Sequence, residues 1–317
     1  MRNIKRFLSP AIRVVCFGLV FLLLCGLCTY YLARPTEFGV ILNAFYQLPR
    51  DSVTTLFVGT SLPYDAYWPD VFDEAAGGGY CYSLTSAGQN LTGSYYVLQE
   101  AFKTQSPEVV VVDANWCLMS IVGDDREPQT NTISDLTIVD ALKPGDTKLA
   151  YILRDIPSQN WIDAAFPFFR YRGDYDMKLL EVNFNSRVNN AGTEYTGRGF
   201  KRFWNTVQDG AVGPVDIYAW RGVQPSYLDA LSRVVALCRE NGALPMILVP
   251  PLSYPALATL TNYQDYLDTL EGFAAWENVL FMDFSLARQQ KLARPDSGYY
   301  DHFHLAGEAI SVPFTRL

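Results

Sequence analysis

Short apolar runs alternate with amphipathic stretches over most of the chain after residue 50. The apolar runs predict strands at residues 54–58, 80–84, 109–112, 246–249 and 279–282. Apolar residues at helical spacing predict helices at 92–103, 226–241 and 263–273, and a last helix that begins at His304. Asn241-Gly242 marks the end of the second helix, since such residues are typical of helix C-termini.

The run of four valines at 109–112 is apolar on both of its faces. Such a strand is typical of the centre of a parallel sheet that helices cover on both sides. Strands that alternate with helices indicate right-handed crossovers, so the sequence predicts an α/β fold with a central parallel sheet. In sheets of this kind, ligands bind beyond the carboxyl ends of the strands.

Residues 120–225 do not follow this alternation and are rich in Asp, Gly, Pro and aromatic residues. We interpret them as an insertion over one end of the sheet, within a globular domain at 51–317. The aromatic side chains suit a core and cap, although stacking on sugars is an alternative.

An uncharged apolar run covers residues 14–32, which is long enough to cross a bilayer. Four basic residues precede it and Arg34 follows, so the positive-inside rule puts 1–13 in the cytoplasm and the bulk of the chain outside. Tyr30 and Tyr31 suit the membrane interface. The sequence predicts a single-pass membrane protein with its anchor at 14–34.

Two other interpretations of this segment are weaker. A cleaved signal peptide has a shorter apolar core and small residues before the cut, whereas Tyr31 takes position −3 for a cut after Ala33. A lipoprotein needs small residues before its cysteine, but Leu24 and Leu27 precede Cys25 and Cys28. We therefore expect an uncleaved anchor.

Composition narrows the function further. The chain has 317 residues, 49% hydrophobic and 18% charged, which excludes a disordered protein. Its net charge of −8 argues against a nucleic-acid partner. Residues 1–34 carry +5, so the rest of the chain carries −13. With two histidines, His302 and His304, multi-histidine metal sites are excluded, and six cysteines do not make a disulfide scaffold. We expect no metal and no cofactor.

Polar residues follow three of the predicted strands, and a fourth group lies near the C-terminus. Ser61 ends Gly59-Thr60-Ser61, Gly88 follows the second strand, and Asn115 follows the valine strand. Asp301 and His304 form an Asp-x-x-His sequence. Taken singly, such motifs are usually turns or helix caps.

Together these residues fill every role in acyl transfer from serine. Ser61 supplies a nucleophile, His304 a general base, and Asp301 a group that orients the imidazole. The backbone N–H groups of Ser61 and Gly88, with the Asn115 side chain, would form an oxyanion hole.

The order of these blocks resembles that of the SGNH/GDSL hydrolase superfamily over residues 52–317. The tail from Tyr300 to Ala309 is similar to the end block of membrane-anchored cell-envelope members, which include DltD-like proteins. The resemblance implies a flavodoxin-like, three-layer fold, a Ser-His-Asp triad and no metal.

The chain departs from the superfamily pattern at three points. Gly-Thr-Ser replaces Gly-Asp-Ser, Asp113-Ala114-Asn115 stands where Gly-x-Asn-Asp is usual, and Leu62 replaces a His or Glu. The sequence therefore does not fix which side-chain amide completes the oxyanion hole. Asn115 is the candidate by position, and Gln89 and Asn90 are its substitutes.

The leading hypothesis is a membrane-anchored, extracytoplasmic serine esterase or acyltransferase. Its substrate would be an acyl ester of a cell-surface polysaccharide or a teichoic-acid-like polymer. The alternative is an inactive protein of the same fold that binds a polysaccharide or a membrane-bound acyltransferase. A phosphate or nucleotide site is disfavoured because GxGxxG and GxxxxGK[ST] sequences are absent.

Overall fold

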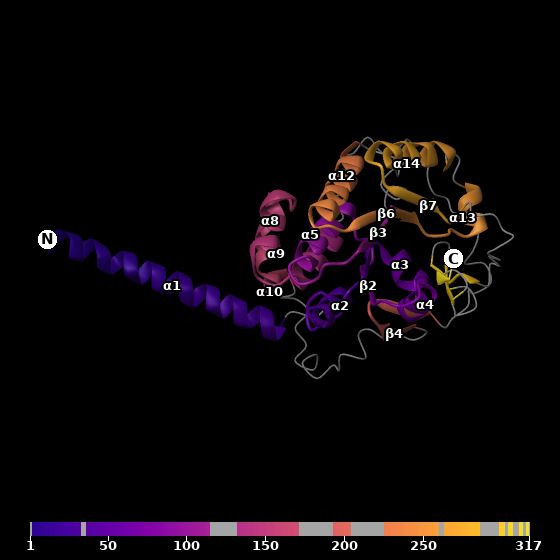
Figure 1. Ribbon diagram of the computed structural model, residues 1–317. Coiled ribbons are helices and arrows are strands. Elements are labelled where there is room, and N and C mark those ends of the chain that lie inside the picture. The colour runs from indigo at the N-terminus through magenta and orange to yellow at the C-terminus, as the bar shows by residue number, and fades with distance from the viewer. Residues whose placement is uncertain are drawn as a thin grey trace.

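A five-stranded parallel sheet forms the centre of the globular body (Figure 1). This computed structural model describes residues 2–32, 36–114, 132–170, 193–203, 225–259, 263–285, 298–301, 304–306, 311–312 and 315–316. The strands are β1 (Thr55–Gly59), β2 (Cys81–Thr85), β3 (Val109–Asp113), β6 (Leu244–Val249) and β7 (Leu280–Asp283). Their order, β2-β1-β3-β6-β7, is that of a flavodoxin-like fold, so the predicted α/β architecture is confirmed.

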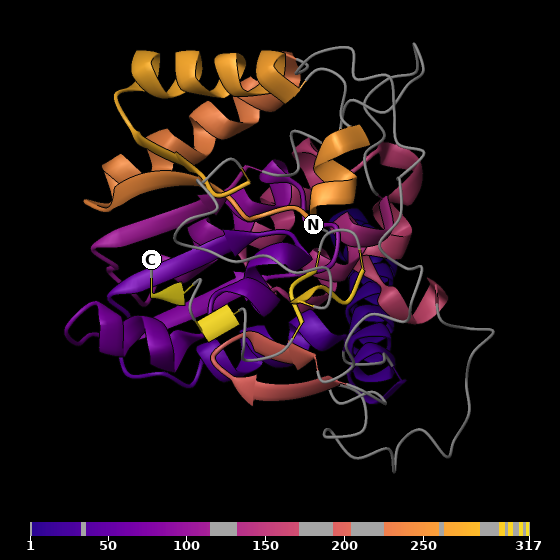
Figure 2. The same cartoon turned by 90° about the vertical axis from the view of Figure 1, so that its right-hand side faces the viewer.

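Helices cover both faces of the sheet (Figures 1 and 2). The helices that follow strands are α3 (Ser61–Ala66), α4 (Pro69–Ala75), α5 (Leu91–Ala101), α12 (Pro225–Glu240), α13 (Tyr254–Thr259) and α14 (Tyr263–Glu277). A long helix, α1 (Arg2–Leu32), and α2 (Glu37–Phe45) precede the sheet. The five predicted strands and the helices α5, α12 and α14 lie within a few residues of their expected bounds.

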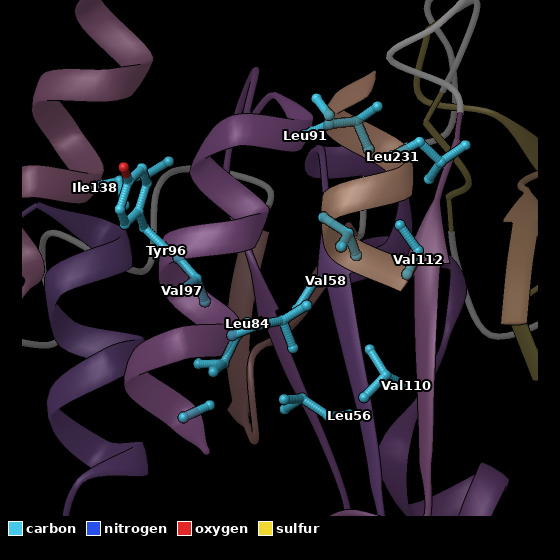
Figure 3. Packing of buried hydrophobic residues seen from close by; sticks show 14 of the residues in the cluster. Leu56, Val58, Leu84, Leu91, Tyr96, Val97, Val110, Val112, Ile138 and Leu231 are labelled. Carbon is cyan, nitrogen blue, oxygen red and sulfur yellow. The ribbon is translucent and has the colours of Figure 1, made fainter. Parts of the chain in front are cut away.

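Alternate residues of β1, β2, β3 and β6 enter one of two cores. Leu56, Val58, Leu84, Val110 and Val112 face α5 and α12, where they meet Leu91, Tyr96, Val97 and Leu231 (Figure 3). Phe57, Val111 and Leu248 face the other way, toward α3 and the C-terminal segment that contains Tyr299 and Leu305. The second core therefore brings the end of the chain next to α3.

The expected last helix does not begin at His304; among the described residues of this segment, Ser311, Val312 and Thr315 are helical. Leu305 instead pairs with Tyr299 in an isolated antiparallel bridge. Leu305 and Tyr299 are both buried against the sheet, so packing of this segment overrides its weak helical pattern.

The described part of the insertion contains helices and a hairpin. The helices are α7 (Thr132–Ala141), α8 (Asp146–Arg154), α9 (Trp161–Ala165) and α10 (Pro167–Arg170), with a 3-10 turn at Ser158–Asn160. Residues of α7 and α8 join the first core beside α5. These helices of the insertion therefore extend the first core.

The hairpin of β4 (Thr193–Gly197) and β5 (Phe200–Phe203) covers the exposed edge of β2. The Ser83 N–H donates a hydrogen bond of 2.8 Å to the Arg198 carbonyl. Gly199 has φ +80°, and a Cβ there would lie 1.8 Å from the Ser83 carbonyl oxygen. The close approach requires glycine and leaves the edge of β2 protected from pairing with other chains.

Helix α1 extends away from the body (Figure 1). Its stretch Pro10–Cys28 has a mean hydropathy of 2.5 and is almost wholly exposed. By length and composition this helix can cross a membrane, as a membrane anchor or a signal sequence does.

Candidate active site

Ser61 stands at the first position of α3, directly beyond the carboxyl end of β1. Thr60 caps the helix, since its hydroxyl accepts a 3.3 Å hydrogen bond from the Leu62 N–H. The first N–H groups of a helix have no partner within it, and they favour negative charge. Ser61 is partly exposed and lies at this N-terminal end of α3.

Asp113, at the end of β3, fixes this turn from the neighbouring strand. Its Oδ2 accepts hydrogen bonds from the Thr60 N–H (3.0 Å) and the Thr60 hydroxyl (2.5 Å). A Cβ on Gly59 would lie 2.3 Å from the Asp113 Cβ, so only glycine permits this approach. Thr60, which departs from the superfamily pattern, thus ties the Ser61 turn to the sheet.

The structure brings Ser61, His304 and Asp301 together, although Ser61 and His304 are 243 residues apart. The Ser61 Oγ lies 2.7 Å from His304 Nε2, and His304 Nδ1 lies 2.7 Å from Asp301 Oδ2. A carboxylate accepts hydrogen bonds, so Nδ1 carries the proton and Nε2 offers a lone pair to the serine hydroxyl. This arrangement is able to remove the proton of Ser61.

Backbone contacts hold the loop that carries His304. The His304 N–H donates to Asp301 Oδ1 over 2.9 Å, and its carbonyl accepts from the Tyr300 N–H over 2.8 Å. The buried Tyr299 hydroxyl donates to the Leu252 carbonyl over 3.1 Å. The position of the imidazole is therefore set by the second core and by the segment that follows β6.

Tyr64 also contacts the site, although the sequence did not indicate it. Its ring stacks on His304 with centroids 6.5 Å apart, and it packs against Ala306. Burial raises the pKa of Tyr64 far above its ordinary value, although a hydrogen bond with Ser61 acts in the opposite direction. Tyr64 therefore stays neutral and acts as a wall of the site.

Gly88 lies on the loop after β2, next to the Ser61 turn. Gly59 is in register with Thr85, and the Ser86 N–H donates to the Gly59 carbonyl over 3.2 Å. Gly88 has φ +68°, which favours glycine. Asn115 lies outside the described residues, as does His302, and the oxyanion roles of Ser61, Gly88 and Asn115 stay predictions.

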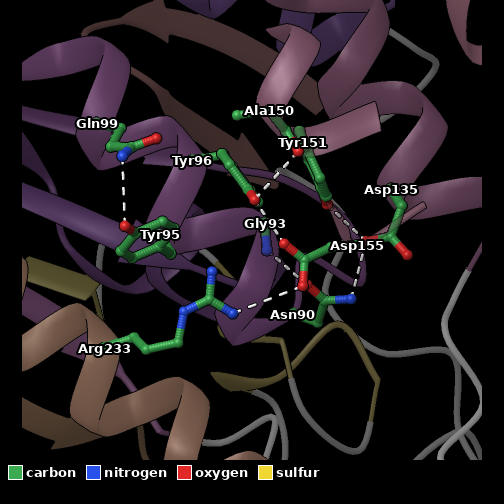
Figure 4. A network of polar contacts seen from close by, with 10 residues as sticks. All are labelled: Asn90, Gly93, Tyr95, Tyr96, Gln99, Asp135, Ala150, Tyr151, Asp155 and Arg233. Carbon is green, nitrogen blue, oxygen red and sulfur yellow. Dashed lines mark hydrogen bonds and ion pairs between the residues drawn. The ribbon is translucent and has the colours of Figure 1, made fainter. Parts of the chain in front are cut away.

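The two substitute amides make contacts elsewhere. Gln89 Nε2 donates to the Leu84 carbonyl (3.2 Å) and to Ser94 Oγ (3.0 Å). Asn90 caps α5 by accepting from the Gly93 N–H, and its Nδ2 donates to Asp135 over 2.9 Å (Figure 4). Both side chains therefore stabilise the loop between β2 and α5.

The buried Asp65, one turn after Ser61, has no hydrogen-bond partner for either carboxylate oxygen within the described chain. Burial raises its pKa well above the ordinary 3.8, and the charges of Asp301 and Asp113 act in the same direction. The buried Lys201 opposes this rise, but it is paired with Glu37 at 2.9 Å. Asp65 therefore keeps its proton to a higher pH when the chain is folded.

We expect Asp65→Asn to remove part of the pH dependence of stability. As the pH rises above 3.8, the unfolded chain loses the Asp65 proton first, so the contribution of Asp65 to the stability of the folded wild type falls with rising pH. Asparagine has no such proton to lose. Urea unfolding from about pH 4 to about pH 8 measures the change, with the exposed Asp229→Asn as control. Identical profiles for the wild type and Asp65→Asn would contradict this account.

Within the described chain, no group of three His, Cys, Asp or Glu residues is placed to hold a metal. The cysteines it describes, Cys16, Cys25, Cys28, Cys81 and Cys238, are free. Burial raises the pKa of Cys238 to about 12, so its thiol is unreactive.

The likeness of this chain to known proteins lies in its structure. No family model and no curated protein matches the chain. Among solved structures it is similar to a GDSL-like lipase from Bacteroides thetaiotaomicron, at 12% identity and a TM-score of 0.40, over 88% of this chain and 93% of that one. A protein assigned as an acylhydrolase, from Bacteroides fragilis, has 11% identity and a TM-score of 0.38, over 86% and 89%.

Proposed function

We propose that the chain is a membrane-anchored serine esterase or acyltransferase of the SGNH/GDSL type. The observation that carries the proposal is the continuous set of contacts from Ser61 Oγ through His304 to Asp301, each of 2.7 Å. The order of the motifs along the chain and the flavodoxin-like strand order also support it.

In the proposed reaction, Ser61 Oγ attacks the carbonyl carbon of an ester while His304 Nε2 takes the hydroxyl proton. Asp301 stabilises the imidazolium that forms. The N–H groups of Ser61 and Gly88, with Asn115, stabilise the oxyanion of the tetrahedral intermediate. When the intermediate collapses, His304 gives its proton to the departing alcohol and the acyl group remains on Ser61.

The second half of the reaction releases the acyl group. His304, neutral again, removes a proton from an incoming hydroxyl, whose oxygen attacks the acyl carbonyl. When this second intermediate collapses, the bond between the acyl carbon and Ser61 Oγ breaks and His304 returns the proton to Ser61 Oγ. If the hydroxyl belongs to water, the reaction is hydrolysis; if it belongs to a sugar, it is transfer. Both use the same residues.

We propose that the substrate is an acyl ester on a cell-envelope glycan, either an O-acetyl or a D-alanyl-type ester. The uncharged apolar stretch of α1 at 14–32, with four basic residues of the same helix before it, favours an anchor whose globular body lies outside the cytoplasm. The C-terminal segment lies at the end of the body opposite α1 (Figures 1 and 2). That placement favours a polymer that extends away from the bilayer. A membrane-bound acyltransferase is the partner proposed for the transfer reaction.

The proposal is tested with the full chain in detergent. We expect release of acid from a small aryl acetate and from an O-acetylated polysaccharide, and loss of both activities in His304→Ala. An alcohol or sugar added as acceptor separates transfer from hydrolysis. Polysaccharide binding without acid release or transfer would instead identify an inactive binding protein.

A further inference from the structure

Large apolar side chains are exposed on two neighbouring helices of the insertion. On α8, Leu149 is 57% and Leu153 52% exposed; on α9, Trp161 is 39% and Ile162 65% exposed. Leu149 and Leu153 are four residues apart and so share one face of α8, and α8 contacts α9. We call these four residues the α8–α9 patch.

The rest of α8 is packed as in an ordinary core. Tyr151 and Ile152 are buried, and the Tyr151 hydroxyl donates to Asp135 over 2.7 Å (Figure 4). Trp161 is fixed through its indole N–H, which donates to the Ile156 carbonyl over 2.9 Å. The patch is therefore a rigid outer surface of a folded unit.

A helix packed against α9 connects the patch to α1. Helix α10, which follows α9 directly, contacts α1. Within the apolar stretch Pro10–Cys28, Cys25 is only 3% exposed, whereas Leu24 is 53% and Leu27 45% exposed. The body therefore covers one side of α1 before its apolar stretch ends.

This contact sets the depth of the body in a bilayer. Cys25 precedes the end of the stretch by three residues, which is about 4.5 Å along a helix. If α1 crosses the membrane, the elements that cover Cys25 reach the level at which acyl chains meet headgroups. Figures 1 and 2 both show α8, α9 and α10 on the side of the body from which α1 departs.

The side chains of the α8–α9 patch suit the boundary between acyl chains and headgroups. Transfer of leucine and isoleucine side chains from water into the acyl region is favourable, and tryptophan is enriched at the interface. The exposed Arg154, at the end of α8, is able to reach lipid phosphates.

We infer that the α8–α9 patch rests in the interface of the bilayer that α1 crosses, with lipid as its partner. The inference depends on the anchoring in the proposed function. Together α1 and the patch attach the body at two places, which fixes its orientation. The loop that carries Asp301 and His304 then faces away from the bilayer and lies at a constant height above it.

Photocrosslinking in proteoliposomes of the purified full chain tests the inference. Ile162→p-benzoylphenylalanine probes the patch, and Leu22→p-benzoylphenylalanine probes α1. Trp276→p-benzoylphenylalanine is the matched control, because Trp276 is an exposed apolar residue on α14, away from α1 (Figure 1). We expect at least roughly tenfold more lipid adduct at position 162 than at position 276, and strong adducts at position 22.

Each other outcome overturns the inference in a recognisable way. Adducts at position 22 with equal low yields at 162 and 276 mean that the anchor stands but the patch is off the bilayer. A crosslinked dimer at position 162 identifies a second chain as the occupant. Absence of adducts at position 22 removes the anchoring as well. Esterase turnover, measured on the same samples, reports separately on the proposed chemistry.

Discussion

Ser61→Ala lowers turnover of a small aryl acetate by about 10³-fold or more, if Ser61 is the nucleophile. Alanine leaves His304 and Asp301 in place but removes the atom that bonds to the acyl carbon. The remaining rate would come from water held near the oxyanion site. Steady-state release of the aryl alcohol by the detergent-solubilised full chain measures the loss.

Ser158→Ala is the matched control for this measurement. Ser158 is exposed in the turn before α9, and the same atom is removed without any contact to His304. The control keeps wild-type turnover, and both variants unfold at the wild-type urea concentration. Equal turnover by Ser61→Ala and wild type would remove Ser61 from the mechanism.

Gly59→Ala destabilises the fold by about 3 kcal/mol and also weakens catalysis. Gly59 has φ +146°, and the added methyl would lie 2.3 Å from the Asp113 Cβ. Relief of this clash moves Asp113 away from Thr60 and so loosens the turn that carries Ser61. Urea unfolding and turnover of the full chain measure the two effects.

A second glycine separates the clash from backbone strain. Gly242 has φ +79°, but a Cβ there would meet no atom within 4 Å. Gly242→Ala therefore costs only the strain of a left-handed residue, about 1 kcal/mol, and leaves turnover unchanged. Equal destabilisation by the two variants would show that the approach of Gly59 to Asp113 does not matter.

The sheet was predictable because its strands β1, β2 and β3 are buried on both faces. The valine run and its neighbours stand out against the polar turns around them. In contrast, α3 and α4 have six and seven residues, too few to show a helical period. The β4–β5 hairpin carried a signal in Gly197-Arg198-Gly199, but its docking on β2 depends on tertiary contact.

The site was predictable where chain order carries the information. Two of the residues, Ser61 and Gly88, follow predicted strands. The other two, Asp301 and His304, form the Asp-x-x-His sequence near the C-terminus. Tyr64 and Asp65 follow Ser61 on a helix that the pattern did not reveal, so their closeness to His304 and Asp301 could not be foreseen. The pair of Lys201 with Glu37 joins segments that no local pattern relates.

Labelling with a fluorophosphonate tests the central claim most directly, because the probe bonds only to an activated serine. Peptide mapping by mass spectrometry after labelling of the full chain identifies the modified residue. The account predicts one adduct, on Ser61, whose formation is lost in His304→Ala. An unlabelled wild type, or an adduct on another serine formed equally fast in His304→Ala, would contradict it.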